Sequence, residues 1–100
     1  MSAYVISDVD ILDDELIKEY RLLAQESIAK YGGRYLARGG RVEPVEGGWT
    51  PKAIVIVEFP DMARAKAWYQ SAAYAKALTV RARALDRRLI FVDGVPAPTE

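Results

Sequence analysis

The sequence predicts an α+β fold in which two helical regions cover one face of a four-stranded antiparallel sheet. Four β-branched and aromatic stretches occur along the chain, at residues 3–9, 34–42, 53–59 and 88–94. Helical patterns separate the first stretch from the second and the third from the fourth. The resulting order, β-α-β-β-α-β, is the split βαβ arrangement of ferredoxin-like domains.

The first helix has the clearest pattern, because apolar residues recur every three or four positions from Leu16 to Tyr31. Asp13 or Asp14 can cap its start, and Gly32 lies just past its end. The stretch KYGGRYLARGG then predicts a helix stop, a short strand and a bulge at the second glycine pair. A phosphate-binding glycine loop is excluded, because such loops follow a strand and open a helix.

The second half predicts a long hairpin loop and a broken helix. Residues 43–52 are rich in proline and glycine. Pro60 and Asp61 end the third strand and open a helix that runs to about Gln70. Ser71 is expected to cap a further helical stretch before the last strand. The apolar stripe of that stretch consists of Ala75, Leu78, Ala82 and Leu85.

The composition is that of a single globular domain. The chain has 100 residues, 51% of them hydrophobic and 28% charged, and this length supports one core. We predict one domain over residues 1–95 and a C-terminal tail over 96–100. The formal net charge of zero argues against nucleic acid as a partner. Because no signal-peptide pattern or membrane-spanning run is present, we expect a cytoplasmic protein without a membrane contact.

The chain contains no cysteine and no histidine. This excludes disulfides and thiolate nucleophiles, and it removes the usual zinc ligands and the commonest general base. Residues 8–15 are acidic but lack the glycine and the spacing of a calcium loop. We therefore expect no metal and no cofactor, and any acid–base chemistry would fall to Asp, Glu, Tyr or Lys.

Both faces of the predicted sheet are apolar. The third strand, for example, alternates Val55 and Val57 with Ile54 and Ile56. Two helical regions can cover only one face, and a solvated face would carry polar residues. A bare apolar face would be a standing interaction surface. We therefore predict a homodimer in which a second copy covers this face by two-fold symmetry.

Candidate catalytic residues are Arg38, Asp8 and Glu58. Strand alternation places Arg34 and Arg38 on one face, where two guanidinium groups could hold a carboxylate or an enolate. The alternative is that they protect an edge strand or pair with acids. Asp8 and Glu58 lie near the ends of two central strands. They could act as acid and base if burial separates their pKa values, or they could simply pair with arginines.

Aromatic side chains are candidate ligand contacts, because phenol and indole groups often line small clefts and orient polar groups there. The alternative for each is a place in the core. Trp49, in the hairpin loop, is expected to reach the partner subunit. The candidate ligand-binding residues are Tyr20, Tyr31, Tyr35, Trp68 and Tyr69.

Four motifs in order, YGGRYLARGG, EGGW, VIVEFP and AWYQSAAY, resemble the bacterial family known as domain of unknown function 1330. The resemblance covers nearly the whole chain. It implies the dimeric α+β barrel superfamily, in which two ferredoxin-like sheets pack into a barrel. That superfamily includes cofactor-independent monooxygenases and muconolactone isomerase. The resemblance also implies a small cleft between sheet and helices, with Trp68 beside it.

This chain departs from the family's pattern at Tyr31, where many relatives carry histidine, and at Ala72 and Ala73, where they carry Pro-Glu. A mechanism that needs an imidazole at the end of the first helix is therefore not expected. Two functions remain open. One is a dimer that binds a small molecule, such as a carboxylate or an aromatic compound, with or without monooxygenase-like or isomerase-like catalysis. The other is a structural or interaction module without catalysis.

Overall fold

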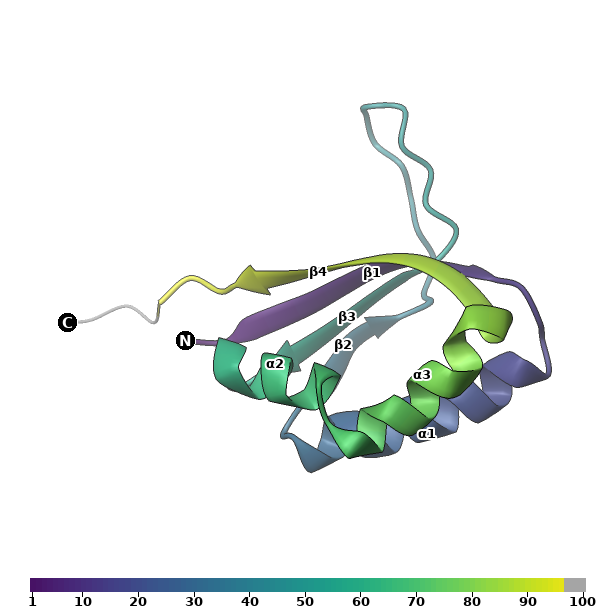
Figure 1. Ribbon diagram of the computed structural model, residues 1–100. Helices are drawn as coiled ribbons and strands as arrows, with labels where there is room; N and C mark the ends of the chain where they lie inside the picture. Colours follow the sequence, from purple (N-terminus) through teal and green to yellow (C-terminus); the bar gives the residue numbers. More distant parts are fainter. Residues whose placement is uncertain (97–100) are drawn as a thin grey trace.

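Four antiparallel strands form one sheet in the order β2-β3-β1-β4. The computed structural model describes residues 1–96. Helices α1, α2 and α3 lie on one face of the sheet (Figure 1). The elements are β1 (Ala3–Ile11), α1 (Leu16–Lys30), β2 (Arg34–Arg38), β3 (Ile54–Phe59), α2 (Met62–Tyr69), α3 (Ala72–Ala84) and β4 (Leu85–Asp93). This order confirms the predicted arrangement. The predicted tail lies outside the described residues except for Pro96.

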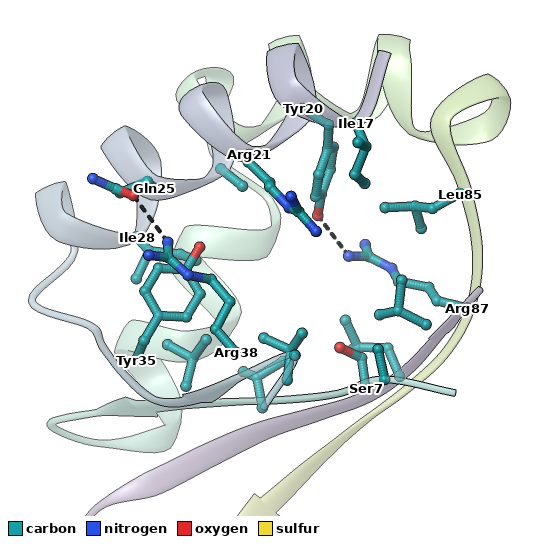
Figure 2. Close-up of a pocket in the computed structure, with 18 of the residues that line it drawn as sticks. Ser7, Ile17, Tyr20, Arg21, Gln25, Ile28, Tyr35, Arg38, Leu85 and Arg87 are labelled. Carbon is teal, nitrogen blue, oxygen red and sulfur yellow. Dashed lines mark hydrogen bonds between the residues drawn. The ribbon is translucent and has the colours of Figure 1, made fainter. Parts of the chain in front are cut away.

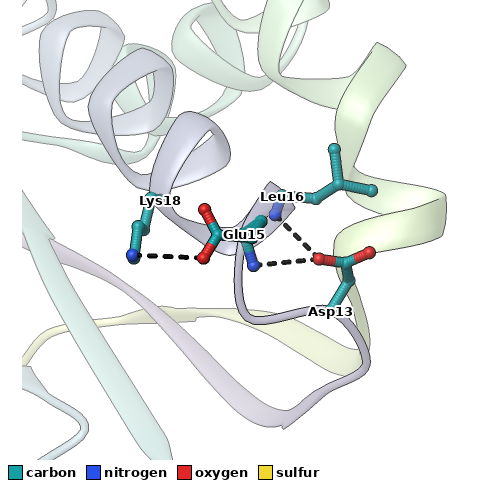
Figure 3. Close-up of polar contacts among 4 residues, drawn as sticks. All are labelled: Asp13, Glu15, Leu16 and Lys18. Carbon is teal, nitrogen blue, oxygen red and sulfur yellow. Dashed lines mark hydrogen bonds and ion pairs between the residues drawn. The ribbon is translucent and has the colours of Figure 1, made fainter.

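Asp13 fixes the start of α1. Its Oδ1 accepts hydrogen bonds from the backbone N–H of Glu15 at 2.9 Å and of Leu16 at 3.0 Å (Figure 3). Its carbonyl accepts from the N–H of Ile17 at 3.0 Å. The two backbone donors hold the pKa of the Asp13 carboxyl below its usual value, because they favour the charged form. Of the two predicted caps, Asp13 is therefore the one that the helix uses.

Two glycines turn the chain from α1 into β2, each for its own reason. Gly32 has a φ of 79°, the left-handed conformation that ends many helices. At Gly33 a Cβ would lie 2.7 Å from a ring carbon of Phe59 and 2.8 Å from Ile28. The predicted helix stop is confirmed, and the second glycine lets the end of α1 pack closely onto β3.

β2 is shorter than predicted, and its bulge lies within the strand. It ends at Arg38, and the loop of residues 39–53 extends from the sheet on the side away from the helices (Figure 1). Tyr35 opposes Val57, but the register then shifts, so that Arg38 opposes Val55. The extra residue reverses the alternation of side chains. The prediction that Arg34 and Arg38 share a face is therefore wrong: Arg38 lies with Tyr35 on the face covered by the helices.

The second helical region is broken where the sequence predicts it. Asp61 caps α2 by accepting from the N–H of Arg64 at 2.7 Å, and Ser71 caps α3 by accepting from the N–H of Tyr74 at 3.0 Å. β4 begins directly after α3, three residues before the predicted start at Arg88. Leu85 is consequently a strand residue that pairs with Ile11 of β1. The predicted helical stripe is wrong, because Ala75 and Ala82 are exposed. The buried residues of α3 are Tyr74, Ala77, Val80 and Ala84.

A packed aromatic core lies between the helices and the sheet. The ring centroid of Trp68 is 4.2 Å from that of Tyr74 and 5.3 Å from that of Phe59. The Trp68 indole N–H donates to Ser27 Oγ at 3.0 Å, so its polar atom is satisfied within the core. Truncating a buried Phe or Trp to Ala generally costs about 3–5 kcal/mol. These rings are therefore an important part of the core. The face of the sheet that the helices cover is here called the covered face.

No helix within residues 1–96 lies over the opposite face of the sheet, here called the open face (Figure 1). Ile6 opposes Ile56 of β3 on one side and Ile90 of β4 on the other, and Ile90 is 57% exposed. The prediction of a sheet with two apolar faces, only one of them covered by helices, is confirmed. Among the described residues, none of the helices has the length and apolar character needed to cross a membrane.

Candidate functional site

An open cleft of about 370 Å³ lies between α1 and the covered face of the sheet (Figure 2). We call it the α1 cleft. Small-molecule sites commonly occupy about 300–1,000 Å³, so this volume is at the lower end of that range. Its walls are mainly apolar, and they include Val5 and Val9 of β1, Val55 and Val57 of β3, and Ile17 and Ala24 of α1.

Three arginines from three different elements line the α1 cleft: Arg21 of α1, Arg38 of β2 and Arg87 of β4 (Figure 2). β2 and β4 are the two edges of the sheet, so Arg38 and Arg87 approach the cleft from opposite sides. Ser7 of the central strand β1 lies between them on the floor, opposite Val55. Within residues 1–96, no aspartate or glutamate lines this cleft.

Arg87 is held by two phenol groups. Its Nη1 donates to Tyr20 Oη at 2.6 Å, and its Nη2 donates to Tyr74 Oη at 2.7 Å. The two phenol oxygens lie 2.6 Å apart and share a hydrogen bond. Burial by itself lowers the pKa of Arg87, but the two phenols raise it by more, so the guanidinium remains charged. Burial also raises the pKa of the Tyr74 phenol, and Tyr20 beside it raises it further.

Arg38 is oriented by two other neighbours. Its Nη1 donates to Gln25 Oε1 of α1 at 2.9 Å (Figure 2). Its guanidinium carbon lies 4.3 Å from the centre of the Tyr35 ring, the geometry of a cation–π contact. Burial raises the pKa of the Tyr35 phenol, and Arg38 opposes this rise. Arg38 is solvent-exposed, so it lies at the mouth of the cleft.

The predicted ligand-binding residues divide into two groups. Tyr20, Tyr35 and Trp68 line the α1 cleft, although Trp68 is only 2% exposed and is mainly a core residue. Tyr31 and Tyr69 do not line it. Tyr31 packs against the core at the end of α1, and the ring of Tyr69 lies 6.0 Å from that of Phe91.

The structure does not bring Asp8 and Glu58 together with Arg38, because both carboxylates lie on the open face. Asp8 accepts from Arg88 Nη2 at 3.0 Å, and Glu58 accepts from Arg34 Nε at 2.8 Å. The hydrogen bond from Arg34, supported by Ser2 and Tyr4, lowers the pKa of the Glu58 carboxyl. The two acids are not neighbours either, since Glu58 opposes Tyr4 whereas Asp8 opposes Ile54.

Sequence reasoning missed Arg87, Arg21 and Gln25 as cleft residues. A signal for Arg87 was present, because it shares the every-second-residue spacing of Leu85, Leu89 and Phe91, the inward positions of a strand. This spacing was overlooked because the helix was expected to continue through Leu85. Arg21 stands one residue after Tyr20 and four after Ile17, the spacing that places it at the border of the apolar stripe of α1.

Solved structures share this fold at low sequence identity. A protein of unknown function from Rhodopseudomonas palustris has a TM-score of 0.76 at 17% identity, over 95% of this chain and 83% of its own. A dimeric ferredoxin-like protein of unknown function from Thermobifida fusca has a TM-score of 0.65 at 15% identity, over 93% and 91%. An antibiotic biosynthesis monooxygenase has a TM-score of 0.53 at 19% identity, over 96% and 100%. These identities show the fold alone.

No curated protein matches the sequence. The family described as Domain of unknown function (DUF1330) matches residues 2–95. This match spans nearly all of the chain and agrees with the four motifs from which the family was predicted. The protein therefore belongs to the DUF1330 family.

Proposed function

We propose that this protein is a homodimer that binds a small molecule in the α1 cleft of each subunit. The observation that carries the proposal is the open volume of about 370 Å³ beside a closely packed aromatic core. Protein interiors normally fill such space with side chains. A cleft with apolar walls and a few oriented polar groups is the usual form of a ligand site.

The residues around the cleft favour binding over acid–base catalysis. Arg38 lines the cleft, but the candidate acids Asp8 and Glu58 are on the other side of the sheet. Monooxygenase-like or isomerase-like chemistry that uses these acids gains no support from this arrangement. A purely structural module gains none either, because it has no need of an unfilled cleft.

The open face supports the dimer. Its centre is the row of Ile56, Ile6 and Ile90, flanked by the ion pairs of Arg34 with Glu58 and of Arg88 with Asp8. A surface with an apolar centre and a charged rim has the anatomy of a protein interface. The loop of residues 39–53, with Trp49 exposed, extends on this side of the sheet (Figure 1). We therefore assign a second copy to this face, with Trp49 reaching across to it.

The cytoplasmic location stays a prediction from sequence.

Filling the cleft from α1 tests the proposal. Ala24 is buried and lines the cleft, whereas Ala29 lies on the exposed side of the same helix. We expect the neutral aromatic probe 2-naphthamide to shift the amide NMR signals of Val5, Ser7 and Val55 in the natural protein. Ala24→Leu should abolish these shifts, because the added carbons occupy the cleft. Ala29→Leu should leave them unchanged.

Thermal unfolding of both variants provides the control for folding. If a folded Ala24→Leu variant binds 2-naphthamide as well as the natural protein does, the ligand site is not this cleft. If neither the amide nor the corresponding acid, 2-naphthoate, perturbs any cleft residue, the protein is better described as a structural module.

A further inference from the structure

We infer that the α1 cleft selects anions, and that its ligand is a small apolar molecule whose carboxylate binds at Arg87. This inference rests on the proposed function and adds the chemical class of the ligand. It is carried by the charge of the cleft, by the hydrogen-bonding capacity of the groups around Arg87, and by the way in which that side chain is held.

Within residues 1–96, the arginines of the cleft have none of the carboxylate partners that Arg34 and Arg88 have. On the open face, Arg34 and Arg88 each form an ion pair with an acid, at 2.8 Å and 3.0 Å respectively. In the cleft, Arg87 contacts phenols and Arg38 contacts an amide, and neither kind of partner is a carboxylate. With Arg21, three cationic groups line one small volume, and no acid within residues 1–96 lines it with them.

Arg87 lines the cleft, and the hydrogen bonds that it makes leave some of its donors unused. A guanidinium has five N–H donors and no acceptor. In the described part of the chain, Arg87 uses two of them on Tyr20 and Tyr74, which leaves three. One phenol donates to the other, so that one further O–H donor remains in the pair. Tyr20 lines the cleft and Tyr74 is fully buried. When Tyr74 donates to Tyr20, the free O–H belongs to the residue that faces the ligand.

A carboxylate is the group that satisfies these donors. It only accepts hydrogen bonds, it neutralises the partly buried charge of Arg87, and its two oxygens match the planar guanidinium. An amide of the same shape would satisfy the donors less well and would leave the charge unpaired. The two phenols already fix the position of Arg87, so little side-chain entropy remains to be lost on binding. The apolar walls then contact the body of the ligand.

The experiment compares two probes of nearly the same shape, 2-naphthoate and 2-naphthamide, by titration calorimetry against the intact chain. Charged hydrogen bonds in a partly buried site contribute about 1.5–3 kcal/mol. We therefore expect the natural protein to bind the acid about 10- to 100-fold more tightly than the amide. Arg87→Gln should reduce this ratio to about one, and Arg87→Lys, which keeps the charge, should retain part of it. Arg83→Gln, an equal change of charge on the exposed side of α3, should leave the ratio unchanged.

The ratio of the two affinities separates a binding role of Arg87 from a purely structural one, because a general loss of structure would weaken both probes equally. If the Arg87 variants do not fold, the natural protein still tests the inference. Its preference for the acid should then decrease as ionic strength is raised. Equal binding of both probes by the natural protein would overturn the inference and leave the proposed cleft intact. Failure of both probes to bind would overturn the proposed function itself.

Discussion

The two faces of the sheet use arginine in different ways. On the open face, Arg34 and Arg88 pair with Glu58 and Asp8, and the charges cancel within each pair. On the covered face, Arg87 is bound by two phenols and Arg38 by an amide and an aromatic ring. The same residue type therefore forms ion pairs on one side and adds positive charge to a cleft on the other.

This difference indicates what each face is for. A face whose arginines are paired with acids around an apolar row can pack against its own copy without burying an unpaired guanidinium. A cleft that retains positive charge can bind an external anion, which neutralises that charge. The bulge in β2 creates the contrast, because it moves Arg38 from the face of Arg34 to the face of Arg87. Three predictions test the comparison between the faces.

The largest effect is expected at the open face. Ile90→Asp places a charge in the centre of the proposed interface, and central interface residues contribute about 2 kcal/mol or more. We expect the dimer to dissociate about 30-fold more readily, as measured by light scattering over a concentration series. Leu22→Asp is the control, because Leu22 is 65% exposed, close to the 57% of Ile90, but lies on α1. A natural protein that is monomeric at micromolar concentration would refute the assignment of a second copy to this face.

A smaller effect is expected for the covered face in alkali. Burial raises the pKa of Tyr74 in the folded state. In the unfolded chain the phenol has a pKa of about 10. As the pH rises, the unfolded chain therefore loses the Tyr74 proton before the folded state does. The stability from this group is therefore fully present below pH 10 and is lost as pH rises. For one such group, the free energy of unfolding should fall by about 1.4 kcal/mol per pH unit in this range. Tyr74→Phe should reduce the slope of the free energy of unfolding between pH 10 and 11, whatever its effect on stability at pH 7.

The smallest effect is expected for the open face in acid. The pKa of Glu58 is lowered by its hydrogen bond from Arg34, so its contribution is present above the unfolded value of about 4.3. That contribution is lost as the pH falls through the lower pKa of the folded state. The Glu58→Gln variant should therefore show a weaker dependence of Tm on pH below 5 than the natural protein. An unchanged acid profile would indicate that this ion pair is too well solvated to matter.

The fold could be predicted from the sequence because its signals are local. The stripe of α1, the capping residues Asp13 and Ser71, and the stop at Gly32 each depend on neighbouring residues. The two-faced apolar sheet depends only on alternation within each strand. These features were therefore accessible without knowledge of how distant segments meet.

The site could be predicted only in part because it depends on register. The alternation rule that placed Arg34 with Arg38 fails at a bulge, and no residue within Arg34–Arg38 is a glycine that would have marked it. Arg87 was missed because β4 follows α3 without a loop, so the change from helical to strand spacing falls inside one basic stretch. The hydrogen bond between Arg87 and Tyr20 connects two residues that lie 67 positions apart in the sequence.

The most direct test of the charge difference between the two faces is the NMR spectrum of the arginine side-chain Nε–Hε groups during titration with 2-naphthoate. Binding in the α1 cleft predicts that the signals of Arg87 and Arg38 shift with saturation, while those of Arg34 and Arg88 do not move. A shift of Arg34 or Arg88 with Arg87 unchanged would place the anion on the open face and contradict the account.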